Sequence, residues 1–298
     1  MNILIIGAKG FIGSYAVEHF SKNHTVWQCD VVVDYVTPNY IQVDATNANY
    51  SAVFENQRFD FCINCSGAAS VPDSLTNPQR DFTLNTVNVF RQLDAIRKYN
   101  PECKYINLSS AAVYGNPEYL PIDELHPLKP ISPYGLHKKM AEAICQSFYE
   151  NFQIKTCSLR IFSAYGAGLQ KQLFWDLYKK AKGSSAISLF GTGSETRDFI
   201  HVHDVVKAMD CVIKKSAFAH DIVNVANGKE LSIKDVAKTF FDIYNPKIEV
   251  TFQNQERKGD PSNWVADLSK LHSTYGFDSE MNLQEGLTNY VKWLKGIE

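Results

Sequence analysis

Three glycines near the start of the chain have the spacing of a phosphate-binding turn. Gly7, Gly10 and Gly13 follow the apolar run 3–6 and precede a segment with helical periodicity. Glycine lets the backbone turn sharply and approach a pyrophosphate, whose charge is attracted by the free N–H groups and positive dipole end of the following helix. Because strand, glycines and helix occur in that order, the motif predicts a dinucleotide-binding site.

Asp30 and Lys9 bear on which dinucleotide such a site would take. Asp30 ends the second predicted strand, where an acid can hydrogen-bond the adenosine ribose hydroxyls and repel the 2′-phosphate of NADP. Lys9, just before Gly10, argues the other way, since a cation near the ribose could pair with that phosphate. We give the acid more weight and expect NAD, with NADP as the open alternative.

A tyrosine and a lysine lie one turn apart at the predicted start of another helix. Ser132 suits the N-cap and Pro133 the first helical position, so Tyr134 and Lys138 share a helix face as i and i+4. Taken alone, these residues favour a half-exposed aromatic ring beside a solvated lysine. A functional pair needs support from the rest of the chain.

Short apolar runs alternate with helical segments through the first half of the chain. The runs are 3–6, 25–29, 61–64, 104–108 and 156–161, and the helical segments lie near 11–22, 79–99 and 133–150. This alternation predicts an α/β fold with a doubly wound parallel sheet of the Rossmann type over residues 1–165. Residues 166–298, with helices near 168–182, 203–214, 232–243 and 283–295, would form mainly a smaller mixed α/β substrate lobe, from which some segments return to the sheet.

Composition argues against several classes of protein. The formal net charge is −2 and no run of Lys and Arg suggests nucleic-acid binding. The longest apolar runs fall far short of the roughly 20 residues of a membrane span, and the N-terminus lacks the basic region of a signal peptide. Seven scattered cysteines favour a reducing cytoplasm over a disulfide framework. His201 and His203 alternate without a third ligand cluster, so we expect no metal site.

These features belong to a pattern spread over nearly the whole chain. Its parts are GAKGFIG (7–13), Asp30, Val43-Asp44, NCSGAA (64–69), Asn85, LSSAAVYG (108–115), YGLHK (134–138), LRIFSAYG (159–166), GTGSETRDFIHVHD (191–204) and ERKGDPSNWVADLSKL (256–271). The pattern resembles extended short-chain dehydrogenase/reductases of the NAD-dependent nucleotide-sugar epimerase/dehydratase family, and UDP-glucose 4-epimerases in particular. The resemblance implies NAD, a nucleoside-diphosphate sugar as substrate, and a homodimer formed through the Tyr134 helix and its neighbour.

The resemblance also gives the tyrosine–lysine pair a role. It implies that Tyr134 is the general acid/base on a sugar hydroxyl or ketone, that Lys138 also holds the nicotinamide ribose, and that Ser110 shares the reacting oxygen. A free phenol has a pKa near 10, too high for a base at neutral pH. We expect the Lys138 ammonium, together with the nicotinium charge, to lower the pKa of Tyr134.

Further cofactor and substrate positions follow from the same resemblance. The implied cofactor-binding residues are the three glycines with Phe11 and Ile12 at the pyrophosphate, Asp44 and Ala45 beside the adenine, and Cys65, Ser66, Gly67 and Asn85 along the dinucleotide channel. The implied substrate-binding residues are Ser109, Ser110, Tyr134, Ser163 and Trp264, with Arg197 and Arg257 at the diphosphate, which two guanidinium forks would suit.

Positions at which the chain departs from the family pattern restrict the reactions that we expect it to catalyse. Ala111 and Ala112 stand where 4,6-dehydratases carry Asp-Glu, so a dehydratase is not expected. Ser163 replaces a common asparagine, and Trp264 would crowd an N-acetyl group. By a small margin we expect a C4 epimerase with a transient 4-keto sugar. An NAD(P)H-dependent ketoreductase of a 4-keto-6-deoxy nucleotide sugar would use the same three catalytic residues and stays open, and a catalytically inactive dinucleotide-binding regulatory protein ranks third.

Overall fold

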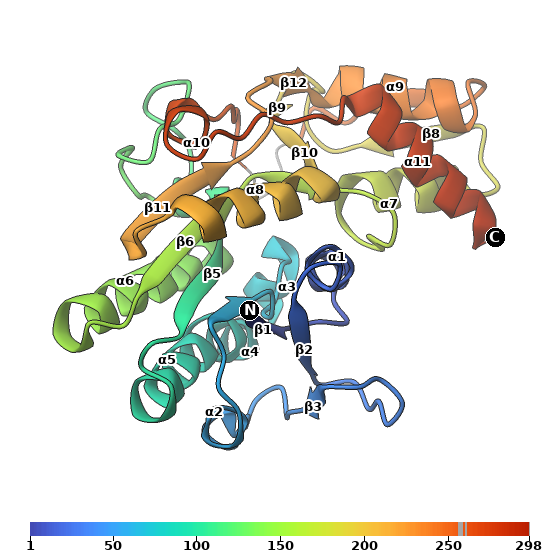
Figure 1. Ribbon diagram of the computed structural model, residues 1–298. Coiled ribbons are helices and arrows are strands. Elements are labelled where there is room, and N and C mark those ends of the chain that lie inside the picture. The colour runs from blue at the N-terminus through green and yellow to red at the C-terminus, as the bar shows by residue number, and fades with distance from the viewer. Residues whose placement is uncertain (256–258, 260, 298) are drawn as a thin grey trace.

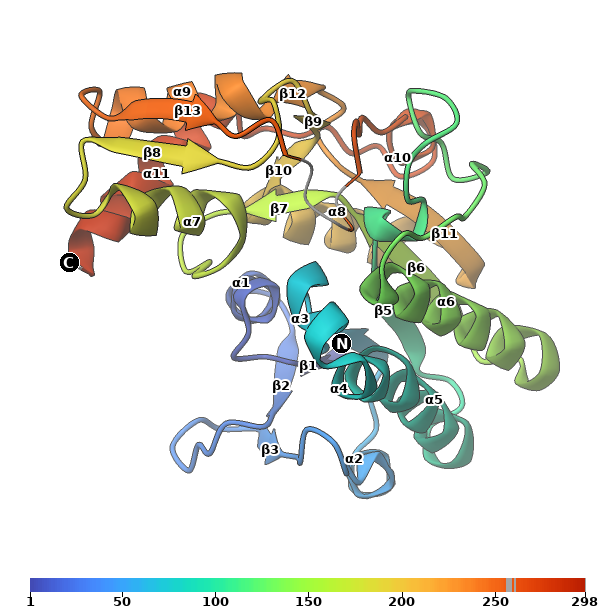
Figure 2. The ribbon, with the colours of Figure 1, turned by 180° about the vertical axis from the view of Figure 1, so that it is seen from behind.

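The computed structural model describes residues 1–255, 259 and 261–297 (Figures 1 and 2). Within them lies a seven-stranded sheet, parallel throughout, in the order β11-β6-β5-β4-β1-β2-β3. Its strands are β1 (Asn2–Ile6), β2 (Thr25–Asp30), β3 (Tyr40–Gln42), β4 (Phe61–Asn64), β5 (Lys104–Ser110), β6 (Thr156–Ile161) and β11 (Ala219–Val225). The predicted Rossmann-type sheet is confirmed.

Helices cover both faces of this sheet because its strands are apolar on both sides. Ile3 and Ile5 of β1 enter a core shared with α1 (Phe11–Phe20) and α8 (Val202–Lys215). Leu4 and Ile6, which point the other way, enter a core shared with α2 (Tyr50–Asn56), α5 (Asn88–Tyr99) and α6 (Pro133–Phe152). The α1 and α6 segments that carry the expected site residues are therefore fixed against opposite faces.

The helical segment predicted over 79–99 is divided into three parts. They are α4 (Pro78–Phe82), the π-helical turn η1 (Thr83–Val87) and α5, and the short helix α3 (Val71–Thr76) precedes them. A π-helical turn shifts the register of the side chains that follow it, and such turns are frequent at functional sites. Here the turn carries the buried Asn85.

A smaller lobe holds the other elements. These are β7 (Ser163–Tyr165), α7 (Gln172–Ala181), β8 (Ala186–Leu189), β9 (Thr196–Arg197), β10 (Phe199–His201), β12 (Leu231–Ser232), α9 (Ile233–Tyr244), β13 (Glu249–Phe252) and α11 (Leu283–Gly296), with β10 paired to β7, β12 to β9 and β13 to β8. Phe174, Phe240 and Tyr290 lie in its core. The short helix α10 (Ser269–Ser273) packs beside β11 instead, with Leu271 in the core of the main sheet. In both views α7, α9 and α11 gather on the side of the molecule opposite α2 and α5. The expected boundary at residue 165 stays a prediction, and α8 and β11 are later segments that pack on the main sheet.

Two further features concern membrane-spanning helices and disulfides. A bilayer-spanning helix, judged by length and apolarity, does not occur in the described part of the chain. All seven cysteines are free thiols.

The strand order reverses direction at β1, which places a crevice at the carboxyl ends of the strands. The strand β1 pairs with β2 on one side and β4 on the other. In open α/β sheets, ligands bind outside the carboxyl ends at such a switch point. Gly7 follows β1 directly and Cys65 follows β4, so the two cofactor motifs flank this point.

Candidate active site

The glycine turn is closely packed between β1 and α1. Gly7 has φ +80°, and a Cβ atom there would lie 2.7 Å from the main-chain nitrogen of Ser66. A Cβ atom on Gly13 would lie 2.0 Å from the carbonyl oxygen of Gly7. The N–H of Gly7 donates to the carbonyl of Cys29 at 2.8 Å. The turn thus joins the ends of β1, β2 and β4, with no room for side chains at these two glycines.

Asp30 faces this turn from the end of β2. Its Oδ2 accepts the main-chain N–H of Lys9 at 2.8 Å, and its Oδ1 accepts the N–H of Val31 at 2.7 Å. The Lys9 ammonium lies 2.6 Å from Asp34 Oδ2. The cation that argued for NADP is therefore paired with a carboxylate that sequence reasoning did not single out.

Asn85, Gly67 and Lys138 converge on one place in the crevice. A Cβ atom on Gly67 would lie 2.5 Å from Asn85 Oδ1 and 3.6 Å from Lys138 Nζ. Asn85 is only 1% exposed, and neither of its amide atoms has a hydrogen-bond partner among the described residues. Because buried polar groups are normally paired, this amide fits a ligand with its own donors and acceptors. With the closely packed glycines, these residues fit a dinucleotide.

The remaining expected channel residues lie beside this place. Cys65 and Ser66 follow β4, and the Ser66 N–H and hydroxyl both donate to Asn64 Oδ1, at 3.1 and 2.5 Å. Phe11 and Ile12 open α1 directly after Gly10; Phe11 packs against the core of the smaller lobe and Ile12 against that of the main sheet. That the loop after β4 and the start of α1 line the dinucleotide channel stays a prediction.

Asp44 and Ala45 lie just past the short edge strand β3. Asp44 Oδ1 accepts the N–H groups of Thr46 and Asn47, at 2.8 and 2.7 Å, which closes the turn. The Ala45 carbonyl accepts a hydrogen bond from the Asn88 side chain at 2.8 Å. The turn is therefore fixed to α5, and its place beside the adenine stays a prediction.

Ser110 and Tyr134 are brought together by close contact between a strand end and a helix start. The helix α6 begins at Ser132, whose hydroxyl accepts the N–H of Gly135 at 3.2 Å, as the predicted N-cap requires. A Cβ atom on Gly135 would lie 2.4 Å from the carbonyl oxygen of Ala112, just past Ser110. The glycine after Tyr134 thus lets the helix start approach the end of β5, and the Ser110 side chain lies close enough to Tyr134 to act on its pKa.

The two titratable groups of this cluster have strongly shifted pKa values. Burial raises the pKa of Tyr134 to about 12, although the hydrogen bond with Ser110 acts to lower it. Within the protein itself burial outweighs the effects that lower this pKa, and the expected lowering by Lys138 together with the nicotinium charge stays a prediction. Burial also lowers the pKa of Lys138 to about 8, against the opposing effect of Asp81. The ammonium lies 6.0 Å from the Tyr134 ring centre.

A buried histidine–aspartate pair lies beside the cluster. His137 Nδ1 is 2.6 Å from Asp81 Oδ2, and the Asp81 side chain is fully buried. His137 directly precedes Lys138, and Asp81 lies on α4. Nothing in the local sequence around Asp81 indicated this pairing, since the two residues are 56 positions apart.

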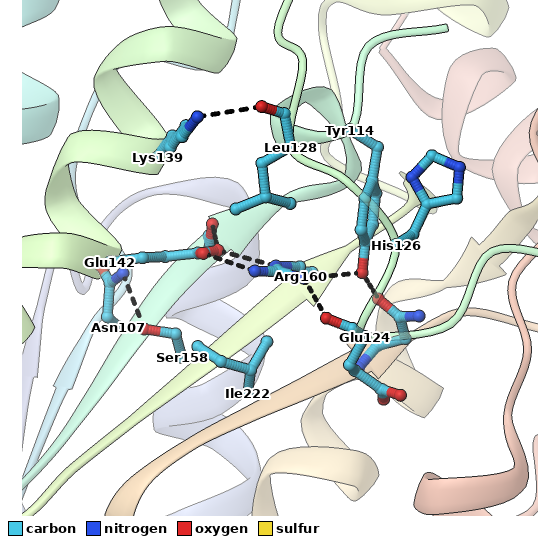
Figure 3. Close-up of polar contacts among 12 residues, drawn as sticks. Asn107, Tyr114, Glu124, His126, Leu128, Lys139, Glu142, Ser158, Arg160 and Ile222 are labelled. Atoms are coloured by element: carbon cyan, nitrogen blue, oxygen red, sulfur yellow. Dashed lines mark hydrogen bonds and ion pairs between the residues drawn. The ribbon is translucent and has the colours of Figure 1, made fainter. Parts of the chain in front are cut away.

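A second buried network anchors α6 across the sheet (Figure 3). Glu142, one turn beyond Lys138, accepts two hydrogen bonds from Arg160 on β6, at 3.0 and 2.8 Å. Arg160 also donates to the Tyr114 hydroxyl and the Glu124 carbonyl, both at 3.0 Å. Ser109 donates its hydroxyl to Glu142 at 2.5 Å. That bond engages Ser109 within the protein, and its expected contact with substrate stays a prediction.

The expected substrate residues of the smaller lobe form a group of their own. The Arg197 guanidinium lies 5.6 Å from the ring centre of Trp264, in the range of a cation–π contact. The Trp264 indole donates to the Gly115 carbonyl at 3.0 Å. Ser163 starts β7, and its N–H donates to the carbonyl of Asp198 at 3.0 Å. Arg257 lies outside the described residues.

The two histidines considered for a metal site stack on each other, with ring centres 5.1 Å apart. Burial lowers the pKa of His201 to about 4, with a smaller contribution from His203. No group of three or more potential metal ligands occurs in the described ranges.

Comparisons with known proteins agree with this geometry. The NAD dependent epimerase/dehydratase family model matches residues 3–226. A putative UDP-glucose 4-epimerase of Methanocaldococcus jannaschii is 32% identical over 320 aligned residues, which cover 98% of each chain. A UDP-glucose 4-epimerase structure from Thermotoga maritima with UDP-glucose gives a TM-score of 0.90 at 25% identity, covering 100% of both chains.

A structure of UDP-N-acetylglucosamine 4-epimerase from Methanobrevibacter ruminantium, in complex with UDP-N-acetylmuramic acid, gives a TM-score of 0.89 at 26% identity, covering 100% of this chain and 99% of that one. These similarities extend over the smaller lobe as well as the main sheet. NAD is the cofactor of the matched family, as the residues predicted. The chain belongs to the NAD-dependent epimerase/dehydratase family of extended short-chain dehydrogenase/reductases, as its motifs predicted.

Proposed function

We propose that the protein is a C4 epimerase of a UDP-hexose that keeps its NAD bound through the reaction. The observation that carries this proposal is the cluster of Ser110, Tyr134 and Lys138 at the crevice where Gly67 and Asn85 meet. Held by the glycine turn, Asp30, Asn85 and Lys138, NAD would supply a reversible hydride acceptor for C4 of the sugar. The relatives named above include epimerases of UDP-sugars, which supports UDP as the nucleotide.

The chain's own residues handle the proton of the C4 hydroxyl. Tyr134 takes it as C4 is oxidised and returns it after the 4-keto sugar has rotated. Ser110 hydrogen-bonds the same oxygen, and Lys138 supplies a buried positive charge that favours the phenolate. Burial raises the pKa of Tyr134 to about 12, and the positive charge that the bound cofactor would supply acts in the same direction as Lys138.

The substrate lobe supports a hexose without an N-acetyl group. Trp264 is 9% exposed and is fixed by its hydrogen bond to Gly115 and by packing against Phe162, with ring centres 6.0 Å apart. A fixed indole would crowd an N-acetyl group. Arg197, next to Trp264, and Arg257 are proposed to bind the diphosphate.

The alternative reactions have weaker support. One argument for a 4-ketoreductase was that Lys9 could bind the 2′-phosphate of NADP. Because Lys9 is paired with Asp34, that argument loses its support. Elimination of water would need an additional acid and base. The two positions where dehydratases carry them hold the buried Ala111 and Ala112 in this chain. A regulatory protein without catalysis would not need Ser110 placed beside Tyr134.

We further propose that the protein is a homodimer that works in the cytoplasm. Large apolar side chains are exposed on adjacent helices, with Phe90 on α5 51% exposed and Leu136 and Met140 on α6 41% and 39% exposed. A second copy that packs the same helices against these would cover them. The free thiols fit a reducing compartment.

The test is turnover of UDP-glucose and UDP-galactose without added dinucleotide, followed by chromatography of the nucleotide sugars. The proposal expects each sugar to be converted into the other. It also expects Tyr134→Phe to lose at least about a hundredfold in rate, the usual contribution of a general acid/base. No conversion of either sugar, together with oxidation of added NADPH when a 4-keto-6-deoxy nucleotide sugar is supplied, would favour the ketoreductase.

A further inference from the structure

An ion pair lies beside the carboxylate expected at the adenosine ribose. The Lys9 ammonium is 2.6 Å from Asp34 Oδ2 and 3.3 Å from Thr37 Oγ1. The main-chain N–H of the same lysine donates to Asp30 Oδ2 at 2.8 Å, and its ammonium lies 5.2 Å from the ring centre of Tyr40. Lys9 therefore connects the glycine turn both to Asp30 and to the loop 31–39.

Asp34 is held in position by its own loop. Its Oδ1 accepts the N–H groups of Val36 and Thr37, both at 2.9 Å, and its Oδ2 accepts the Thr37 hydroxyl at 2.5 Å. The hydrogen bond from Lys9, followed by those from Thr37 and Val36, holds the pKa of Asp34 well below its usual range. The carboxylate is therefore ionised at neutral pH and fixed opposite the ammonium.

The charged side chains at this end of the crevice have a net negative charge. Lys9 contributes one positive charge, and Asp30 and Asp34 contribute two negative charges. Tyr40 responds to the same groups, since burial and then Asp30 and Asp34 raise the pKa of its phenol to about 12. A phosphate brought beside Asp30 would meet two carboxylates and an ammonium that is already paired.

We propose that Asp34 is a specificity-determining residue that excludes NADP by pairing with Lys9. Without Asp34, the glycine turn would offer a free ammonium to a 2′-phosphate; with it, only the hydroxyl-binding carboxylate of Asp30 is available. The proposal rests on the dinucleotide site of the proposed function and does not depend on the sugar chemistry.

The test is the Asp34→Asn variant, stripped of dinucleotide and titrated with NAD and NADP by equilibrium dialysis. Asparagine keeps the oxygen that accepts the Val36 and Thr37 N–H groups, so the turn is retained while the charge is removed. The Kd for NADP is expected to fall about tenfold, the effect of one charge-assisted hydrogen bond. The Kd for NAD is expected to change by less than about twofold, because Asp30 keeps its hydrogen bonds.

Two controls separate the charge from a loop effect. Adding Lys9→Met to Asp34→Asn removes the cation, so the gain in NADP affinity should vanish, and the gain with Lys9 present should shrink as ionic strength rises. If Asp34→Asn does not fold, Asp34→Ser keeps an acceptor for the turn and carries the same expectation. Equal changes for both nucleotides, or a gain that survives Lys9→Met, would overturn the proposal. Wild-type protein that binds neither nucleotide would contradict the proposed function instead.

Discussion

Lys138 donates a hydrogen bond from its ammonium to the main-chain carbonyl of Leu108, 2.8 Å away. Leu108 lies in β5 two residues before Ser110, and Lys138 lies one turn after Tyr134. The bond therefore connects the strand end that carries the serine to the helix that carries the tyrosine. It also satisfies one donor of the ammonium of Lys138, a residue that is only 6% exposed.

The buried amine of Lys138 should make stability depend on pH. Burial lowers its pKa from 10.5 to about 8, so between these values the unfolded chain binds a proton that the folded chain does not. Stability therefore rises with pH in this window, by roughly 3 kcal/mol in total, and the contribution is constant below it. Urea unfolding from pH 7 to 10.5 should show the stability of wild type rise by roughly 3 kcal/mol relative to that of Lys138→Met, which lacks the titrating amine. A difference that does not vary with pH would contradict this assignment.

The packing of the glycine turn predicts different effects for two similar substitutions. A methyl group on Gly13 would lie 2.0 Å from the Gly7 carbonyl oxygen, whereas one on Gly10 would lie 3.1 Å from the same atom. Gly13→Ala should therefore cost about 1–3 kcal/mol of stability, as overpacking does, and greatly weaken NAD binding. Gly10→Ala, the matched control, should cost less stability. Thermal unfolding and NAD titration of both variants check this, and equal losses of stability would count against the geometry.

Because the ion pair between Glu142 and Arg160 is buried, removal of one partner should strongly lower the free energy of unfolding. Both side chains are almost completely buried, at 6% and 4% exposure. Glu142→Ala leaves an unpaired buried guanidinium and should cost about 3–5 kcal/mol in urea unfolding. The double variant Glu142→Met, Arg160→Met leaves no unpaired charge and should be more stable than Glu142→Ala. A double variant that is less stable than the single one would refute this account.

The proposed dimer predicts the effect of a charge on α6. Met140 is 39% exposed on the face proposed to be covered by a second copy. Met140→Glu would place a buried carboxylate in that interface, so analytical ultracentrifugation should show monomers. Phe190→Glu is the matched control, because Phe190 is 50% exposed on the smaller lobe and should leave the dimer intact. If the two variants sediment with the same oligomeric mass, this choice of interface is refuted.

The sequence predicted best those structural features that are determined by residues close together in the chain. The strands of the main sheet are continuous apolar runs because both faces are buried, and the start of α6 is set by Ser132 within its own turn. Gly13 is likewise required by a contact close in sequence, with the carbonyl of Gly7, whereas Gly7 itself is also confined by the distant Ser66.

Pairs that join distant elements could not be read from the sequence. The Asp81–His137 and Glu142–Arg160 pairs each connect two secondary-structure elements, and no spacing rule relates their members. The raised pKa of Tyr134 could not be read from the sequence for the same reason, because burial depends on all the elements packed around the ring. The π-helical turn at Asn85 lies inside a segment whose periodicity predicted a continuous helix.

The most direct test of the proposed epimerase is the identity of the dinucleotide that leaves the purified protein. The protein would be prepared without added cofactor and denatured, and the released nucleotides quantified by chromatography. A C4 epimerase restores its cofactor in every cycle, so about one NAD(H) per chain is expected. Little bound dinucleotide, together with preferential binding of added NADPH, would contradict the epimerase and favour a reductase that takes up its hydride donor at each turnover.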